Sequence, residues 1–333
     1  MIRSNKKDSL LQRFAHVFIF TCSIASVNAS AIELDHGDRA EFTKGSLHWV
    51  TLSELLPTQP VIAHDQVNYK LASFSANPDK LYDALCESYG ATDQVLSHDK
   101  NATPADPDSF TCAGEIGDKV KDINTVIVGP GGKLYLTDGH HSFSTFFDMK
   151  QGGPTLPVYV QVQENWSSEK SDSAFWAKLD KANNSWRYQA DGKEVSYQDM
   201  PTSLGRHSLA NDPYRGAMYF AKKIGWNKGD AVAINYLEFH WASEFRNKIT
   251  LSKYDLNDPQ RYLNKIKALS HAMIATDSNK IIGKSGYTAA ALGQKDKWNK
   301  KSDKAFNKLL CNKGKLGKLG FALSARNIDV SCQ

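Results

Sequence analysis

The alternation of hydrophobic and polar residues is clearest between residues 46 and 163, where it changes between the period of a strand and that of a helix. The β-branched run 125–128, the glycine-rich turn 129–132 and the apolar run 133–136 predict a hairpin. A helix is expected directly after it, at 140–149. The other elements expected in this part are a strand and a short helical turn within 47–56, helices at 67–74 and 80–89, and a strand at 157–162.

After Ser168 the apolar residues recur with the spacing of helices. We therefore predict an α+β fold: a small mixed-sheet domain at 46–163, followed by a mainly helical region at 164–275. Residues 276–333 form a separate lysine-rich segment. The expected helices cover 169–179 (with Ser168 as the predicted cap), 216–224, 233–249 and 259–274.

The first 29 residues have the pattern of an export signal. Four basic residues come before or at the edge of an apolar run, 14–27, which is too short for a stable membrane-spanning helix. Small residues at Val27 and Ala29 predict cleavage before Ser30. A retained N-terminal anchor is the alternative. No later segment is long and apolar enough to cross a membrane, so we expect a periplasmic or secreted protein.

Removing this signal changes the charge of the chain. The full sequence carries a formal net charge of +5, but residues 1–29 contribute +3 of it. Residues 280–320 alone hold eleven lysines and two aspartates, which leaves the rest of the mature chain acidic. Charge alone therefore does not indicate a nucleic-acid-binding protein, and any contact with a polyanion is expected from the C-terminal segment.

Four cysteines remain after the signal, and an even number in an exported chain indicates disulfides. Three pairings are possible. The simplest is local, with Cys86–Cys112 enclosing a surface loop expected at 97–109 and Cys311–Cys332 holding the end of the chain. A zinc site is not indicated, because no Cys-x-x-Cys spacing occurs.

Several short motifs follow one another along the chain. They are Pro57-Thr58-Gln59, Lys70, the run from Val126 to His141, Phe175-Trp176, Asp212-Pro213-Tyr214-Arg215 and Glu238-Phe239-His240-Trp241-Ala242. Over residues 46–250 this series resembles the ParB-like nuclease family, a distant branch of the ParB/sulfiredoxin superfamily. The resemblance implies a small α+β fold whose strand-to-helix turn binds nucleotide or phosphate. It also implies nuclease activity, as a family-level label.

The sequence departs from this superfamily at three positions. Ser142 stands where many kinase-like and ParB-like members have an arginine, so a bidentate phosphate ligand is missing. Gly139 precedes His140 where sulfiredoxins have their cysteine, which argues against reduction of sulfinic acids. Gln59 lies near the place of the catalytic carboxylate of serine kinases, and an amide cannot take a proton.

The turn Asp138-Gly139-His140-His141 is the main candidate site. A helix N-terminus favours an anion, the two imidazoles are candidates for acid–base catalysis, and Asp138 for orienting one of them. The alternative is structural: Asp138 caps the helix, one histidine is packed and the other solvated. A divalent metal ion is a candidate cofactor. Adjacent histidines on a helix diverge by about 100°, so both cannot easily bind one ion, which would need ligands from elsewhere. His207, His240 and Glu238 are of the right type.

Gln59, Lys70, Gly139 and Arg215 are the candidate phosphate-binding residues. Pro213 is expected at the first helical position behind the cap Asp212, which leaves Arg215 one turn into the helix and able to replace the missing arginine. The alternatives are an internal ion pair for Arg215 and a solvated helix position for Lys70. For Trp176 and Trp241, packing is expected rather than stacking on bases.

We therefore predict an exported phosphodiester hydrolase in which His140 or His141 acts as acid or base and Lys70 and Arg215 neutralise charge. The expected partner is nucleic acid or another phosphorylated ligand, and the oligomeric state is left open. A binding module without catalysis is the first alternative. A nucleotide-dependent phosphotransferase is the second, and export argues against it because ATP is scarce outside the cytoplasm.

Overall fold

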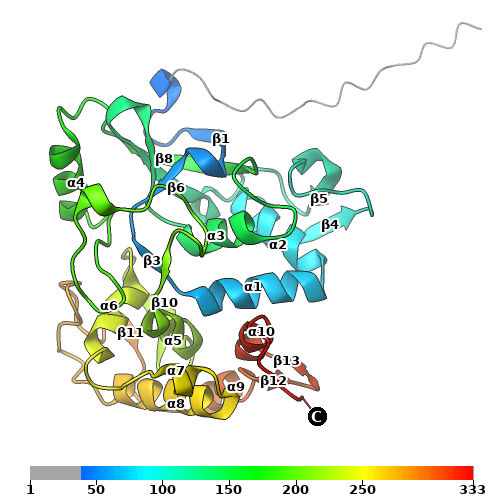
Figure 1. Ribbon diagram of the computed structural model, residues 1–333, viewed down its shortest axis with the longest axis vertical. Coiled ribbons are helices and arrows are strands. Elements are labelled where there is room, and N and C mark those ends of the chain that lie inside the picture. Colours follow the sequence, from blue (N-terminus) through cyan, green and yellow to red (C-terminus); the bar gives the residue numbers. More distant parts are fainter. Residues whose placement is uncertain (1–38, 333) are drawn as a thin grey trace, which may run out of the picture. The chain divides into compact units, whose positions relative to one another are not determined.

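The computed structural model describes residues 39–332, all within one compact unit. The predicted signal at 1–29 lies outside the described residues. The fold is α+β, as predicted (Figure 1). The predicted boundaries between the small α+β domain, the helical region and the lysine-rich segment, at 163/164 and 275/276, stay predictions. In the structure, one large hydrophobic core is built from residues 42–209 and a second from residues 217–323.

A mixed five-stranded sheet has the order β1-β8-β6-β7-β2. The predicted hairpin is confirmed, because β6 and β7 pair antiparallel with Val126 opposite Leu136. β1 also pairs antiparallel with β8, whereas β6 with β8 and β2 with β7 are parallel pairs. The strands are β1 Leu47–Thr51, β2 Leu55–Pro57, β6 Asn124–Val128, β7 Leu134–Leu136 and β8 Pro157–Asn165.

Both faces of the sheet are covered, which explains why residues 126–128 form a continuous apolar run rather than an alternating one. Successive side chains of a strand point to opposite faces. Val126 and Val128 belong to the core that also contains Phe143 and Phe146 of α3, whereas Ile127 packs with a cluster around α4. The helices of this part are α1 His64–Ala76, α2 Asp79–Ser88, α3 His140–Asp148 and α4 Asp172–Lys181.

The second core is mainly helical and lies beyond residue 212. Its helices are α5 Pro213–Ala221, α6 Leu237–Phe245, α7 Lys253–Leu256, α8 Pro259–Ile274, α9 Lys300–Phe306 and α10 Lys318–Ser324. Short strand pairs accompany them: β10 Trp226–Ala231 with β11 Leu292–Gln294, and β12 Cys311–Asn312 with β13 Lys315–Leu316. In Figure 1, α10 runs beside α1, and the two helices are in extensive contact.

Several predicted boundaries were wrong. The helix expected from residue 169 begins at Asp172, with Ser171 rather than Ser168 as its cap, because the Ser171 hydroxyl accepts from the N–H of Ala174. The helix expected from residue 233 begins only at Leu237, after Tyr236 in the left-handed region. Short 3₁₀ helices cover Arg39–Glu41, Leu52–Glu54, Pro107–Ser109, Val120–Asp122, Pro130–Gly132 and Tyr197–Asp199.

Two further strand pairs gave no recognisable signal in the sequence. β3 Val61–Ile62 pairs with β9 Ala210–Asn211, and β4 Val95–His98 pairs with β5 Phe110–Cys112. The loop expected at 97–109 is therefore framed by two short strands. Strands of two to four residues are too short for a periodic pattern, so only their partners define them.

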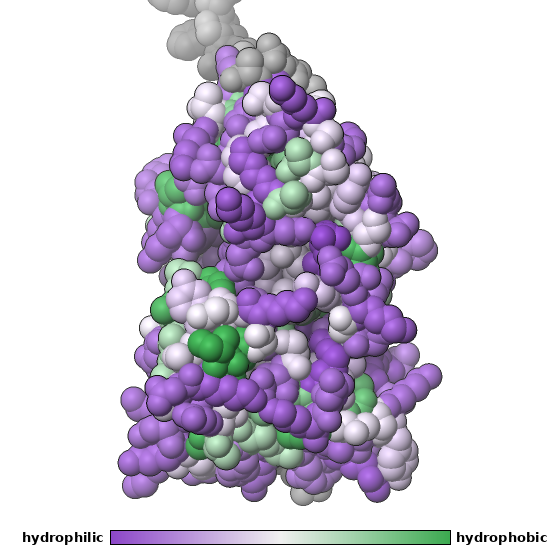
Figure 2. Space-filling view, turned by 90° about the vertical axis from the view of Figure 1, so that its left-hand side faces the viewer, coloured by the Kyte–Doolittle hydropathy of each residue, from purple (hydrophilic) through white to green (hydrophobic). Residues whose placement is uncertain are grey.

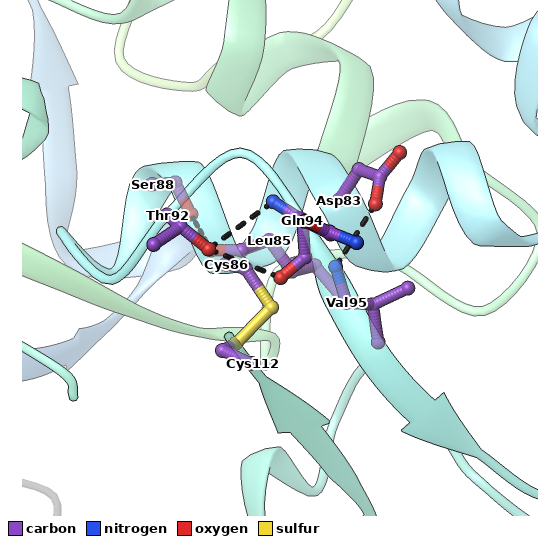
Figure 3. Close-up of a disulfide and its surroundings, with 8 residues drawn as sticks. All are labelled: Asp83, Leu85, Cys86, Ser88, Thr92, Gln94, Val95 and Cys112. Carbon is purple, nitrogen blue, oxygen red and sulfur yellow. Dashed lines mark hydrogen bonds between the residues drawn. A yellow bond between two sulfur atoms is a disulfide. The ribbon is translucent and has the colours of Figure 1, made fainter. Parts of the chain in front are cut away.

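Both disulfides pair as predicted. Cys86 of α2 is bonded to Cys112 of β5, and Cys311 of β12 to Cys332 near the end of the chain. Figure 3 shows that the first disulfide joins α2 to the β4–β5 ribbon, where the N–H of Val95 also donates to Asp83 Oδ1 at 3.0 Å. The ribbon is therefore held to α2 at two points.

Within residues 39–332, no helix combines the length and apolar character that crossing a bilayer requires. The face of the molecule in Figure 2 is mainly hydrophilic, and its hydrophobic residues form small, separate patches.

Candidate functional site

A cavity of about 360 Å³ lies where the β7–α3 turn faces α1, α5 and α6. All seven predicted site residues line it, although they are up to 156 positions apart in the sequence. The structure therefore brings the predicted residues together, and their catalytic and binding roles stay predictions. They are Gln59, Lys70, Asp138, Gly139, His140, His141 and Arg215.

Gly139 defines the turn that begins α3. Its φ of +92° is in the left-handed region, which glycine adopts at little cost. A Cβ atom at this position would lie 2.3 Å from the side chain of Asn124 on β6, so a larger residue does not fit. The interpretation that Asp138 caps the helix is wrong, because Gly139 occupies the cap position. The carboxylate of Asp138 is exposed, and its Oδ1 accepts the N–H of Gly139 at 2.7 Å.

His140 and His141 are both buried, so the interpretation that one of them is solvated is wrong. Nε2 of His140 accepts the backbone N–H of Thr58 at 3.0 Å, just after β2. Nε2 of His141 accepts the N–H of Ala63 at 2.9 Å, just before α1. The two rings diverge as expected for neighbours on a helix, and each satisfies a buried backbone donor of a different segment.

These hydrogen bonds and the burial keep both imidazoles neutral. Burial lowers the pKa of His140 to about 3. Burial, followed by the nearby positive charges of Arg215 and Lys70, lowers the pKa of His141 well below its ordinary value. A ring whose Nε2 accepts an N–H carries its proton on Nδ1. Within the described residues neither Nδ1 has a protein partner, which leaves two neutral N–H donors for a ligand.

Arg215 is brought to the cavity by α5. The predicted cap is confirmed: Asp212 accepts from the N–H groups of Tyr214 and Arg215, and Pro213 occupies the first turn. The Arg215 side chain is 8% exposed. Its Nη1 donates to Gln66 Oε1, its Nη2 lies 3.7 Å from Glu238 Oε2, and its Nε has no partner among the described residues. The guanidinium group is thus only partly satisfied by the protein.

Lys70 is half-buried rather than solvated, and its Nζ donates to Ser142 Oγ at 3.1 Å. Burial lowers its pKa. A cation from α1 therefore stands beside the position at which many relatives carry an arginine. Gln59, which also lines the cavity, is buried, and its Nε2 donates to the carbonyl of Val61 at 2.6 Å.

The first turn of α3 adds backbone donors. Within residues 39–332, the N–H groups of His140, His141 and Ser142 make no hydrogen bond, as expected at a helix N-terminus. These groups line the same cavity as Arg215 and Lys70. The residues that carry three free backbone donors, two imidazole N–H groups and two cations thus line one cavity, and donors of these kinds suit a phosphate or another oxyanion.

Sequence reasoning did not find the other charged residues of the cavity. The cavity is also lined by three lysines and three acidic residues: Lys121, Lys222, Lys228, Glu87, Asp122 and Glu238, the last of which was named above as a possible metal ligand. Nothing in their local patterns separates these lysines from solvated ones. Only their position around the cavity does so.

The remaining candidates lie elsewhere or serve packing. His240 is buried against the Trp186 ring, with centroids 5.2 Å apart, and His207 is exposed. Among the described residues, no group of three or more His, Cys, Asp or Glu side chains is placed to hold a metal ion. Trp176 and Trp241 are buried in the two parts of the fold, as predicted.

Fold and cavity together define an α+β protein whose strand-to-helix turn lines a cavity together with Lys70 and Arg215. A family model described as "Putative ParB-like nuclease" matches residues 48–247, and the chain belongs to this family. Among solved structures, protein Atu1540 from Agrobacterium tumefaciens is similar, with 20% identity and a TM-score of 0.49. The match covers 72% of this chain and 97% of that one. A search of curated proteins finds no match.

Proposed function

We propose that the cavity binds a phosphate group of a phosphodiester and that the protein hydrolyses this ester outside the cytoplasm. The observation that carries the proposal is the state of Arg215. A buried guanidinium group needs an anion to balance its charge, and among the described residues the ion-pair partner of Arg215 is Glu238, whose Oε2 lies as far as 3.7 Å from Nη2. Arg215, Lys70 and the first residues of α3 line one cavity.

In this proposal, the phosphate oxygens accept from the free N–H groups of α3 and from Arg215. Lys70, held beside Ser142, lies within the same cavity and neutralises the second charge that develops in the transition state. Gly139 is required for the turn, because its φ is positive and a Cβ atom at this position would meet the side chain of Asn124. The binding part of the proposal thus uses five of the seven predicted residues: Lys70, Gly139, His140, His141 and Arg215.

Hydrolysis requires a water oxygen to attack phosphorus while the bond to the leaving oxygen breaks. A histidine with a pKa of about 3 is uncharged at neutral pH, so His140 is poorly suited to donate a proton as an imidazolium. We assign His140 and His141 instead the role of neutral Nδ1–H donors to the phosphoryl oxygens. The exposed carboxylate of Asp138 takes the proton of the attacking water, and the leaving oxygen takes a proton from solvent as its bond to phosphorus breaks.

The test separates binding from hydrolysis. Mature protein, starting at Ser30, is incubated with fluorescent single-stranded DNA and RNA, with and without Mg²⁺ or Mn²⁺. Anisotropy reports binding and gel electrophoresis reports cleavage. We expect Arg215→Gln to weaken binding at least tenfold, because the variant keeps a polar side chain but loses the charge and the guanidinium donors. Lys308→Gln, an exposed lysine away from the cavity lining, serves as the control.

The roles of the turn are tested in the same assays. Asp138→Asn and His140→Asn are expected to lower the cleavage rate more than the affinity. Cleavage that survives these substitutions would remove the proposed mechanism. Binding that depends on Arg215 without cleavage of any substrate would instead establish the alternative, a binding module on the same fold.

Export is part of the proposal. Two disulfides and the lack of a membrane-spanning helix in residues 39–332 are compatible with an exported protein. N-terminal sequencing of the protein recovered from outside the cytoplasm is expected to begin at Ser30. A chain that retains residues 1–29 would support the anchored alternative.

A further inference from the structure

The C-terminal segment, which lies beyond the family match, is fixed against the helix that carries Lys70. α10 packs along α1. Arg326 Nη1 lies 3.3 Å from both carboxylate oxygens of Asp65 in α1 and donates to the carbonyl of Leu256 at 3.1 Å. The disulfide Cys311–Cys332 closes the segment. Residues of α10 therefore have defined positions relative to the cavity.

Lys318, the first residue of α10, extends toward two tyrosine rings. Its Nζ lies 5.5 Å from the ring centroid of Tyr69 and 5.3 Å from that of Tyr219. Tyr219 lines the cavity, and Nζ of Lys222, which also lines it, lies 5.5 Å from the same ring. The two ammonium nitrogens are therefore at most 10.8 Å apart, the sum of their distances to one centroid.

The nearby charge of Glu238 acts on Lys222, but without an ion-pair contact. Within residues 39–332, neither Lys222 nor Lys318 forms an ion pair with a carboxylate. Their charges also oppose each other: desolvation first, and then repulsion from Lys222, lower the pKa of Lys318, although the residue as a whole is exposed. Lys222 lines the cavity and Lys318 lies beside the lining residue Tyr219, and cations gathered in this way without a carboxylate in contact are typical of an anion site.

We propose that Lys318 and Lys222 form a second phosphate subsite beside Tyr219, so that the ligand spans two phosphate groups. This inference rests on the proposed function, because the first phosphate is the one held at α3 by Arg215 and Lys70. The segment outside the family match thus completes the site. The ligand class becomes a molecule with linked phosphates, a nucleic-acid strand rather than a single phosphate ester.

The ligand-spanning arrangement is tested with two matched probes. TpT has one phosphodiester and can fill one subsite, whereas the thymidine hexanucleotide dT6 has five and can reach both. We expect Lys318→Met to weaken dT6 binding about five- to tenfold and to lower the slope of log affinity against log salt by roughly one, with TpT unchanged. Lys318→Arg is expected to retain dT6 binding. Lys315→Met, an exposed lysine of the neighbouring β13, controls for general charge.

The outcomes distinguish this inference from the proposed function. If Arg215→Gln weakens both probes and Lys318→Met weakens neither, the second subsite is wrong and the proposed function stands. If the unmodified protein binds neither probe, both are wrong. An equal loss in Lys318→Met and Lys315→Met would also overturn the subsite, because it would show only a general charge effect. Competition between ATP and dT6 identifies the source of the phosphates. A lower affinity for ATP than for dT6 supports a nucleic-acid strand as the ligand, and a higher affinity for ATP would show that the ligand is a nucleoside polyphosphate.

Discussion

The imidazole of His141 joins the first turn of α3 to the start of α1, because its Nε2 accepts the N–H of Ala63 at 2.9 Å. His140 makes the equivalent bond to the N–H of Thr58, after β2. The two segments that carry Gln59 and Lys70 are thereby tied to the turn that carries Asp138. The two histidines therefore hold together the segments that form the cavity.

Acid is expected to destabilise the protein through His140. Its pKa is about 3 in the fold and near 6.5 when unfolded, so the neutral form contributes stability that is fully present above pH 6.5 and lost as the pH falls toward 3. The loss at pH 4 is roughly 3 kcal/mol. Urea unfolding of His140→Asn should therefore show a smaller decrease between pH 7 and 4 than unmodified protein. The exposed His207→Asn is the control, and equal slopes for all three proteins would contradict the prediction.

Gly139→Ala is expected to destabilise the fold more than Gly131→Ala. Both glycines have positive φ, so alanine costs each about 1 kcal/mol of backbone strain. Only at Gly139 would the new Cβ meet Asn124, whereas at Gly131 nothing lies within 4 Å. Thermal unfolding measures both variants. Asn124→Ala should partly restore the stability of Gly139→Ala, and failure to do so would show that the contact is not the cause.

Breaking the buried ion pair of Asp212 should be far more costly than removing an ordinary cap. Asp212 is fully buried, caps α5 and lies 2.8 Å from Arg246 Nη2. Asp212→Ala leaves Arg246 buried without its partner, which costs about 3–5 kcal/mol. Asp258, the cap of α8 and also followed by proline, is the matched control at about 1 kcal/mol. Similar values for the two alanine variants in urea unfolding would disprove the difference.

The two disulfides should stabilise the chain similarly but affect binding differently. They enclose 26 and 21 residue steps, and loop-closure entropy predicts about 3.5 kcal/mol for each. Serine variants of either pair should therefore unfold at lower urea concentration. Only the Cys311/Cys332 pair should also weaken dT6 binding, because it holds the segment of Lys318. An equal effect of the Cys86/Cys112 pair on dT6 would contradict this.

Binding of dT6 should weaken as the pH rises from 7 to 9.5. The pKa of Lys318 is lowered to about 8, so its ammonium group loses its proton over this range, while the phosphodiesters keep their charge. Lys318→Arg should remove most of this decrease, and an unchanged pH profile in that variant would assign the effect elsewhere. The titratable groups that face Lys318 are Tyr69, Lys70, Tyr219, Lys222 and Lys223.

Features with a local cause could be predicted from the sequence. The hairpin before Asp138 and the helix after it follow from turn residues and periodicity, and the Asp212-Pro213 cap from the chemistry of one helix turn. The two disulfides followed from the shortest of three pairings. The candidate turn was identified by the same local signals together with the order of the family motifs.

Local patterns and motif order were enough to predict the α+β class, the candidate turn and the residue types of the site. The effects of these residues on one another depend on tertiary packing. The partner of His140 is 82 positions away and that of His141 is 78, and Lys318 reaches Tyr69 across 249 positions. The pKa of a buried imidazole or a crowded lysine depends on desolvation and on neighbouring charges, and packing alone brings such distant groups together.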